Sequence, residues 1–438
     1  MESKNIKSIK IARELLQSHE FKERYKNTPT AFTRIRKLHF STLMVLMLQK
    51  GLKSLQLRLN ELVLSLERSE SVSNSAFTQA RANLDYRAFI ELNQKSVVDV
   101  MYSDNNIKTY KGMRVLGIDG SKIILPSTPS IIDEFGEVSY GSKKTFTQGD
   151  YSYALASTVY DVLNRVVIDS SLNKYSNYEV DLTIKHLPLT NDNDLLIYDR
   201  GYPSFRHLAH LAKANKKFVM RCSSVSFKDA RDMLKGNGSS DRTITLKVHS
   251  GKAKEIENFN LPKEIKVRFV RVVLETGEYE VLVTNLLDKV EFPTDEFAYI
   301  YYLRWGVEEF YGIIKNRLTL ENFSGKTAHS IYQDFYSTIY LCGLETLLTN
   351  DTNIELQHKK TKNKQQVNHA VSFNVIKNEA LKLLLDDNPL NNILERLEIL
   401  FKTNPIQIRP NRKIPRIKTS DYKLYNYHKR AKKYAFSS

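Results

Sequence analysis

The 438-residue sequence contains only two cysteines, Cys222 and Cys342, and no run of about 18 apolar residues. Two cysteines exclude a disulfide scaffold and a cysteine-based zinc site. The lack of a long apolar run argues against a membrane-spanning helix. Residues 1–10 are charged and have no apolar stretch, so we expect no secretory signal. Together these absences predict a cytoplasmic protein without a membrane partner.

Acidic residues are scarce relative to basic ones. The chain has 49 Asp and Glu against 66 Lys and Arg, which leaves a net charge of +17. Such an excess favours a polyanionic partner, most simply nucleic acid. The hydrophobic content of 41%, with 24 Tyr and 20 Phe, supports packed domains, and the length predicts two or three of them. Composition leaves open whether the protein binds its polyanion or also cuts it.

The N-terminal region, residues 1–110, has the three- and four-residue apolar spacings of helices. Three helices are expected early in it, over 9–25, 31–49 and 52–67. A further helix is expected over 76–95, with Ser73 or Ser75 as its N-cap. Side chains near its start can reach DNA, namely Thr78, Gln79 and Arg81. We interpret the region as a helical DNA-binding region, and a plain helical bundle is an equally good alternative.

From Met113 the sequence changes to short β-type runs. Strands are expected over 114–118, 122–125, 153–160, 165–168, 195–198 and 218–221. Asp119-Gly120 is expected to form a hairpin turn between the first two strands. Helices are expected over 178–187 and from Pro203 to about residue 215. This alternation predicts a mixed α/β sheet with at least one parallel crossover.

The remaining chain completes the predicted domain organisation. Residues 223–290 alternate like antiparallel strands, and helices are expected over 294–318, 329–348 and 373–386. The predicted parts are a helical DNA-binding region at 1–110, the first part of a core at 111–222, a β-rich insertion at 223–290, the second part of the core at 291–328, and a helical and basic C-terminal region at 329–438.

The C-terminal tail from Arg409 to Lys433 has ten basic residues against one acid, Asp421, which gives +9. Tyrosines are interleaved with these basic residues. We interpret the tail as a phosphate-binding arm, with a solvated tail as the alternative.

Two aspartates follow apolar strands. Asp119 ends the run Val115–Ile118, and Asp199 ends the run Leu195–Tyr198. Ligands of α/β sheets gather at the carboxyl ends of strands, and carboxylates there can share a hard cation such as Mg²⁺. Either aspartate alone would be more typical of a turn or a helix cap.

A third acid lies in a predicted helix beside cationic residues. At about 100° per residue, Tyr301, Arg304, Glu308 and Lys315 fall within an arc of roughly 60°. Glu309 falls on another face, so Glu308 is the better catalytic candidate. A salt-bridged surface row would give the same stripe, but two strand-end aspartates precede it in the order that a metal-binding sheet needs.

These motifs resemble the cut-and-paste DNA transposases of the DDE type, in the insertion-sequence group with the Tyr-x2-Arg-x3-Glu-x6-Lys signature. Tyr301, Arg304, Glu308 and Lys315 match that signature at every spacing. Asp119-Gly-Ser resembles the first acid motif of the family, and Asp199-Arg-Gly-Tyr resembles the second. The likeness covers about residues 115–327.

The resemblance implies a ribonuclease H-like core interrupted by a β-rich insertion. It implies that Asp119, Asp199 and Glu308 hold two Mg²⁺ ions, with Mn²⁺ as a substitute, for cleavage at transposon ends and strand transfer into target DNA. It also implies DNA contacts, which we assign to Tyr301, Arg304, Lys315, Arg200 and Lys326.

The implied partners are double-stranded DNA, both terminal inverted repeats and target, and a second copy of the chain in the DNA complex. The implied location is the bacterial nucleoid. Some members stack a Trp of the insertion on a flipped base, but the only Trp here is Trp305. Phe259, Phe269 or Tyr279 can take its place, and the choice among them stays open.

Two alternatives stay open: a ribonuclease H-like nuclease without transposition, and an inactive DNA-binding copy. Other recombinase classes fit poorly. No His is followed by Arg three residues later, as tyrosine recombinases need, and no His-x-His is present for a single-strand transposase.

Overall fold

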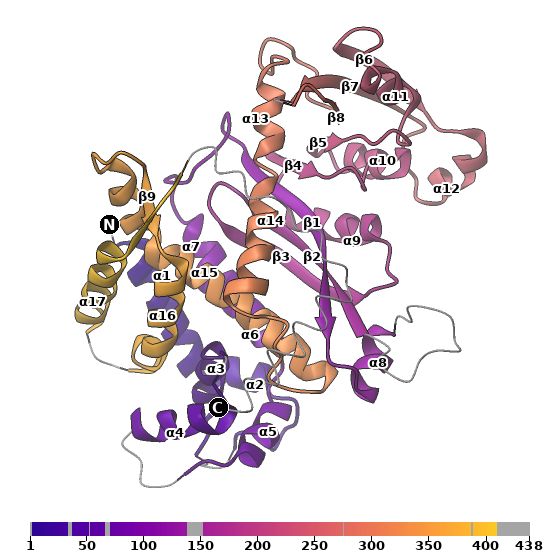
Figure 1. The fold of residues 1–438 in the computed structure, drawn as a ribbon. Coiled ribbons are helices and arrows are strands. Elements are labelled where there is room, and N and C mark those ends of the chain that lie inside the picture. The colour runs from indigo at the N-terminus through magenta and orange to yellow at the C-terminus, as the bar shows by residue number, and fades with distance from the viewer. Residues whose placement is uncertain are drawn as a thin grey trace, which may run out of the picture. The chain divides into compact units, whose positions relative to one another are not determined.

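The computed structural model describes the residues 2–33, 37–51, 53–65, 71–137, 152–274, 276–386 and 389–409. The chain divides into two compact units (Figure 1). The first unit comprises Met1–Asp104, Ile124–Ser152 and Gly312–Ser438, and the second comprises Asn105–Ile123 and Tyr153–Tyr311. Beyond Arg409, the basic tail predicted to bind phosphate lies outside the described residues.

The second unit is built on an eight-stranded sheet. Its strands are β1 (Arg114–Leu125), β2 (Ser152–Asp161), β3 (Val166–Lys174), β4 (Asp194–Tyr198), β5 (Lys217–Arg221), β6 (Asp241–Lys247), β7 (Glu264–Val273) and β8 (Tyr279–Thr284). Their order is β3-β2-β1-β4-β5-β8-β7-β6. The β1–β4 and β4–β5 pairs are parallel, while β2–β3, β5–β8, β7–β8 and β6–β7 are antiparallel. The predicted mixed sheet is confirmed, and the order of the first five strands agrees with a ribonuclease H-like core.

The strands expected in the β-rich insertion are present, and they extend this same sheet. β8 pairs with β5, and β7 and β6 follow outward. The segment also contains two short helices, α11 (Lys228–Leu234) and α12 (Ala253–Asn258). The insertion therefore widens the core sheet toward one edge.

The hairpin turn predicted at Asp119-Gly120 is wrong. β1 runs without interruption from Arg114 to Leu125, and Gly120 has no left-handed backbone. A glycine after an aspartate is a common turn signal, but here its missing side chain serves a close approach. A Cβ on Gly120 would lie 3.0 Å from the carboxyl carbon of Glu179.

Four further helices of the second unit complete its core. They are α9 (Glu179–His186), α10 (Phe205–Lys213), α13 (Glu296–Tyr302) and α14 (Trp305–Gly312). Phe297 and Ile300 of α13 pack into a cluster with Val219 of β5 and Leu282 of β8. β4 is fully buried, and its apolar run Leu195–Tyr198 is typical of a central parallel strand covered on both faces.

The helix predicted over 294–318 is interrupted. α13 ends at Tyr302, α14 begins at Trp305, and residues Ile313–Arg317 form a π-helical turn. Because the segment is not one regular helix, a count of 100° per residue does not place Tyr301, Glu308 and Lys315 on one stripe.

The first unit is mainly helical. Its helices are α1 (Lys4–Gln17), α2 (His19–Arg24), α3 (Phe40–Leu48), α4 (Leu55–Ser65), α5 (Asn74–Ala82), α6 (Arg87–Asn93), α7 (Asp99–Met101), α8 (Pro129–Phe135), α15 (Ala328–His358), α16 (His369–Leu385) and α17 (Leu390–Thr403). β9 (Gln365–Val367) and β10 (Pro405–Gln407) form a separate two-stranded sheet. The long α15 contacts α3, α6 and α16.

Several N-terminal boundaries differ from the predicted ones. The expected helix 9–25 is divided at Ser18, whose side chain caps α2. The expected helix 76–95 is divided into α5 and α6, followed by a π-helical turn from Gln94 to Val98. Ser73 is the N-cap of α5 and accepts from the Ala76 amide, so one of the two predicted caps is confirmed.

No helix within the described ranges is both long enough and apolar enough to cross a membrane.

Candidate active site

Asp119 and Asp199 lie side by side in the second unit. β1 and β4 are parallel and in register up to the pair Ile118 and Tyr198. The residues that follow this pair are Asp119, within β1, and Asp199, directly after β4, and the charge of Asp199 acts on Asp119. The expectation that each aspartate ends a strand therefore holds for Asp199, whereas β1 continues past Asp119 to Leu125.

Helix α14 is held close to β1. A Cβ on Gly117 would lie 3.3 Å from Cβ of Val307, and a Cβ on Gly306 would lie 2.9 Å from Cβ of Val162. The Tyr311 hydroxyl donates to the backbone oxygen of Asp119 at 3.1 Å. Gly117 and Tyr311 thus fix the helix that carries Glu308 against the strand that carries Asp119, while Gly306 lets the helix approach the turn after β2.

Arg304 connects the acids electrostatically. Its Nη2 donates to Oε1 of Glu308 at 2.7 Å, and its charge acts on both Asp119 and Asp199. The side chain is only 3% exposed, yet its Nε and Nη1 have no hydrogen-bond partner among the described residues. A buried guanidinium with unused donors is suited to an anionic oxygen that comes from a ligand.

The Asp199 carboxylate accepts hydrogen bonds from two groups of the protein. Tyr301 donates from its hydroxyl to Oδ1 of Asp199 at 2.9 Å. Burial acts to raise the pKa of Asp199, but the Arg200 amide, the Arg304 charge and the Tyr301 hydroxyl outweigh it and lower that pKa. Asp199 therefore stays ionised, as a metal ligand must.

Asp119 has a different environment. Burial raises its pKa to about 7, against the charge of Arg304 and one hydrogen bond from the Gly120 amide. The charges of Asp199 and Glu179 add to the rise. Two neighbouring acids and one backbone donor leave the Asp119 carboxylate short of partners, so a bound cation would stabilise its ionised form.

Sequence reasoning missed Glu179, the first residue of α9. Its carboxyl group lies over Gly120, where Cδ would be 3.0 Å from an added Cβ, and it contributes to the raised pKa of Asp119. Acids are common in the first turn of a helix, so the position of Glu179 at the start of α9 gives no sign of a site. Gly120 is the local signal of this close approach, but its place after an aspartate favours a turn instead.

The other predicted DNA contacts are placed as follows. Arg200 is exposed directly after Asp199, and Lys326 is exposed in the loop before α15. Lys315 lies in the π-helical turn that follows α14. Tyr301 is buried, and its hydroxyl is bound to Asp199 rather than directed to solvent. These four stay predictions as DNA contacts.

The aromatic candidates for base stacking differ in exposure. Phe269 is fully buried in the sheet, which excludes it. Phe259 is 50% exposed and Tyr279 is 41% exposed. Arg271 lies over the Tyr279 ring, with its guanidinium carbon 4.9 Å from the ring centroid.

Arg81, expected to reach DNA from α5, is buried instead. Its guanidinium forms an ion pair with Asp334 of α15 at 2.7 Å and donates to Gln333 and Ser324. The acid that neutralises it is 253 residues away in sequence, so local pattern cannot reveal the pairing. The interpretation of Arg81 as a DNA contact is wrong, while Thr78 and Gln79 are exposed.

Within the part of the chain that the structure describes, no group of three or more His, Cys, Asp or Glu side chains is arranged to hold a metal ion. The chemistry of Asp119 and Asp199 nevertheless suits a hard divalent cation, because such ions prefer carboxylate oxygens as ligands. Few protein donors stabilise the Asp119 carboxylate, so a cation would do so. Glu308 is bound to Arg304, so its membership of the set stays a prediction.

Comparison with known proteins gives one family. The model of the family described as "Transposase DDE domain" matches residues 110–341, which is more than half of the chain. The chain is 24% identical over 259 residues to the transposase InsG for insertion sequence element IS4 of Escherichia coli (strain K12). That match covers 57% of this chain and 56% of the relative, so the chain spans about half the length of the curated relative.

Among solved structures, the chain is similar to the piggyBac transposase in its synaptic complex with hairpin DNA. The TM-score is 0.45 at 11% sequence identity, with 96% of this chain and 89% of that chain covered. This likeness is too distant to carry an argument about function.

Proposed function

The chain belongs to the transposase DDE domain family, and from this premise we propose that it is a DNA transposase. It would cleave DNA at transposon ends and transfer the cut strands into target DNA. The observation that carries the proposal is the register of β1 and β4, which sets Asp119 beside Asp199. The charge of Arg304 acts on both acids, and its Nε and Nη1 are unused.

Asp119, Asp199 and Glu308 are the residues that would hold the metal in this proposal. Members of the family generally use divalent metal ions, and we propose two Mg²⁺, with Mn²⁺ as a substitute. When bound, such ions supply Lewis-acid activation of the attacking hydroxyl and stabilise the leaving oxygen. The low pKa of Asp199 and the donor-poor Asp119 suit this role.

Arg304 would bind the phosphate to be cleaved. Its free Nε and Nη1 can donate to phosphate oxygens, and the guanidinium fork matches their geometry. Tyr301 would act as a positioning residue, since its hydroxyl holds Asp199. Lys315, Arg200 and Lys326 would contact the DNA backbone outside the reacting phosphate.

The proposed partners are terminal inverted repeats and target DNA, bound by a homodimer that pairs two ends. The proposed location is the nucleoid in the bacterial cytoplasm. Exposed Phe259 and Tyr279 stay as candidates for stacking on a flipped base if the reaction includes a hairpin.

The test is cleavage of a labelled duplex that spans the terminal repeat of the element and its flank, with Mg²⁺. Wild type, Glu308→Gln and the matched control Glu309→Gln are compared, because Glu309 is the exposed neighbour on the same helix. We expect wild type and Glu309→Gln to nick at the repeat boundary. Glu308→Gln should bind the duplex equally and cut at least about 10³-fold more slowly.

Equal cutting by all three proteins would remove Glu308 from the mechanism. Cutting without joining to a target duplex would favour the nuclease without transposition. Binding without cutting by wild type would favour the inactive copy.

A further inference from the structure

A groove of about 770 Å³ opens in the first unit between the end of α3, the start of α4, the π-helical turn after α14 and α16. We call it the basic groove because cationic side chains dominate its charged lining. Those cations are Lys50, Lys53, Arg58, Arg317 and Lys377, against the single acid Glu61. Five positive charges and one negative charge leave a formal +4.

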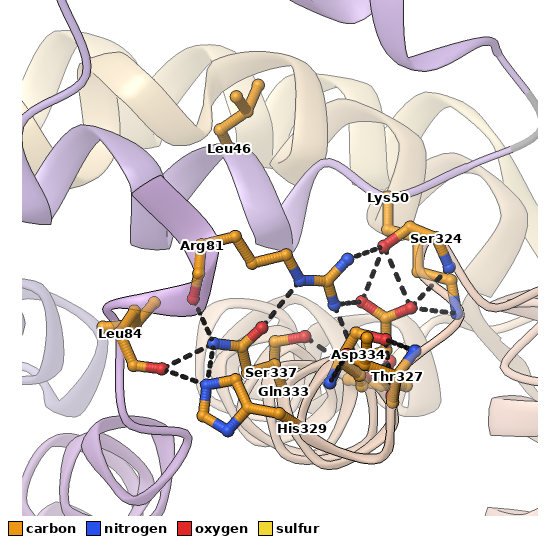
Figure 2. Close-up of polar contacts among 12 residues, drawn as sticks. Leu46, Lys50, Arg81, Leu84, Ser324, Thr327, His329, Gln333, Asp334 and Ser337 are labelled. Atoms are coloured by element: carbon orange, nitrogen blue, oxygen red, sulfur yellow. Dashed lines mark hydrogen bonds and ion pairs between the residues drawn. The ribbon is translucent and has the colours of Figure 1, made fainter. Parts of the chain in front are cut away.

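The acids near the basic groove are already paired. Figure 2 shows Lys50 and Arg81 directed toward Asp334, the buried acid of α15. Arg81 Nη2 lies 2.7 Å from Oδ1 of Asp334, and Lys50 Nζ lies 3.7 Å from Oδ2. Glu61 is bound by Lys53 at 2.6 Å. Lys50, Arg81 and Lys53 therefore take up the negative charge that is available nearby.

Arg58 is buried and forms no ion pair within the described residues, although the charges of Asp334 and Glu61 reach it. The residue is only 6% exposed, its Nη1 makes one long contact of 3.5 Å to the Leu46 carbonyl, and its Nε has no hydrogen-bond partner among the described residues. Buried donors in folded proteins nearly always find a partner. The unused donor of Arg58 thus indicates a ligand that the groove would receive.

Lys377 adds a second cation that lacks an acid. Its Nζ donates to the Lys50 carbonyl at 2.6 Å, and it forms no ion pair within the described part of the chain. Burial, followed by the charges of Lys50 and Arg58, lowers the pKa of Lys377 to about 8. Burial and the neighbouring positive charges both disfavour the protonated amine, so an anion in the groove would stabilise it.

We propose that the basic groove binds phosphate groups, and that the DNA backbone supplies them. The choice of DNA rests on the proposed transposase function, whereas phosphate binding itself rests on the groove alone. Arg58 would offer its free donor from the inside of the groove, with Lys377 beside it and exposed Arg317 at its rim. Neutralisation of backbone phosphates by Lys and Arg is the main source of sequence-independent DNA affinity.

The first arm of the test measures binding of a fluorescent duplex by anisotropy, without divalent metal, over a range of salt. The groove variant is Arg317→Gln with Lys377→Gln, and Arg317→Gln alone guards against misfolding. The control is Lys10→Gln with Lys382→Gln, which removes the same charge from two exposed lysines of the first unit. We expect the groove variant to bind about tenfold more weakly, with a salt slope lower by one to two.

The second arm measures thermal unfolding in inorganic phosphate and in chloride of equal ionic strength. Wild type and control should gain stability from phosphate, and the groove variant should gain less. Equal behaviour of groove variant and control in both arms would overturn the proposal, whatever the cleavage test gives. A response to phosphate with unchanged DNA affinity would overturn the DNA backbone as the source.

Discussion

Asp334 in the first unit and Asp119 in the second are both aspartates close to an arginine, but their pKa values move in opposite directions. Asp334 is the more deeply buried, with 1% of its surface exposed. Burial would raise its pKa, but Arg81, Lys50 and the Ser324 amide lower it. Burial raises the pKa of the more exposed Asp119 to about 7.

The number of donors explains this difference. Asp334 accepts from Arg81 at 2.7 Å, from the Ser324 amide at 2.6 Å and from the Ser324 hydroxyl at 2.8 Å (Figure 2). Asp119 accepts from the Gly120 amide and faces two further acids. Donors within the protein stabilise the charge of the structural acid Asp334. The charge of the proposed catalytic acid Asp119 would instead be stabilised by a bound cation.

The largest effect on stability is expected at Asp334. Asp334→Asn leaves Arg81 buried without its counter-charge, and we expect a loss of about 3–5 kcal/mol in the free energy of unfolding. Urea denaturation measures it. Asp351→Asn, an exposed site on the same helix, should change stability by less than about 0.5 kcal/mol. A loss at Asp334 as small as that at Asp351 would contradict the comparison.

The opposite sign is expected at Asp119. The folded state raises its pKa from 3.8 to about 7, so the folded protein binds the extra proton more tightly than the unfolded chain. The stability that this proton supplies is present below pH 4 and is lost as the pH rises through about 7. Without metal, Asp119→Asn should therefore stabilise the protein at pH 8, by on the order of 2 kcal/mol.

Denaturation at pH 8 and at pH 4 in a chelator measures this gain for Asp119→Asn. The difference between variant and wild type should shrink at the lower pH, because the folded Asp119 carboxyl is then protonated and pH 4 lies close to its unfolded-state pKa of 3.8. A variant that is less stable than wild type at pH 8 would show that Asp119 is structurally satisfied.

The smallest effect is expected at Glu179, whose charge contributes to the raised pKa of Asp119. Glu179→Gln should move the pH midpoint of the Asp119-dependent stability change downward, by a fraction of a pH unit. Asp181→Asn on the same helix is the control, since its carboxylate is paired with Arg206. An unchanged midpoint in Glu179→Gln would remove Glu179 from the site.

Local sequence pattern predicts an element well when the residues of that element are enough to specify it, such as an apolar run or an N-cap serine. The apolar run Leu195–Tyr198 is a buried central strand, and the Ser73 cap begins a helix, as expected. Asp119 and Asp199 are brought together because each follows an apolar run, and these two runs pair in parallel register. The local sequence was enough to select both as candidates, and their catalytic role stays a prediction.

The errors arise where a partner distant in sequence decides the structure. The local sequence favours a turn at Gly120, but in the structure the carboxyl group of Glu179 occupies the space above this residue. The sequence position of Arg81 suggests a DNA contact, but in the structure Asp334 neutralises its charge. The helix that carries Glu308 reads as continuous, but it is interrupted before Trp305 and turns π-helical at Ile313. Neither the two contacts nor the interruption of this helix has a local signature.

The central claim is that a bound divalent cation stabilises the ionised Asp119 carboxylate. Titration of Mn²⁺ followed by electron paramagnetic resonance, at pH 8 with wild type and Asp119→Asn, tests it most directly. The account predicts that wild type binds Mn²⁺ and that the variant binds it at least about tenfold more weakly. Equal Mn²⁺ affinity in the two proteins would contradict it.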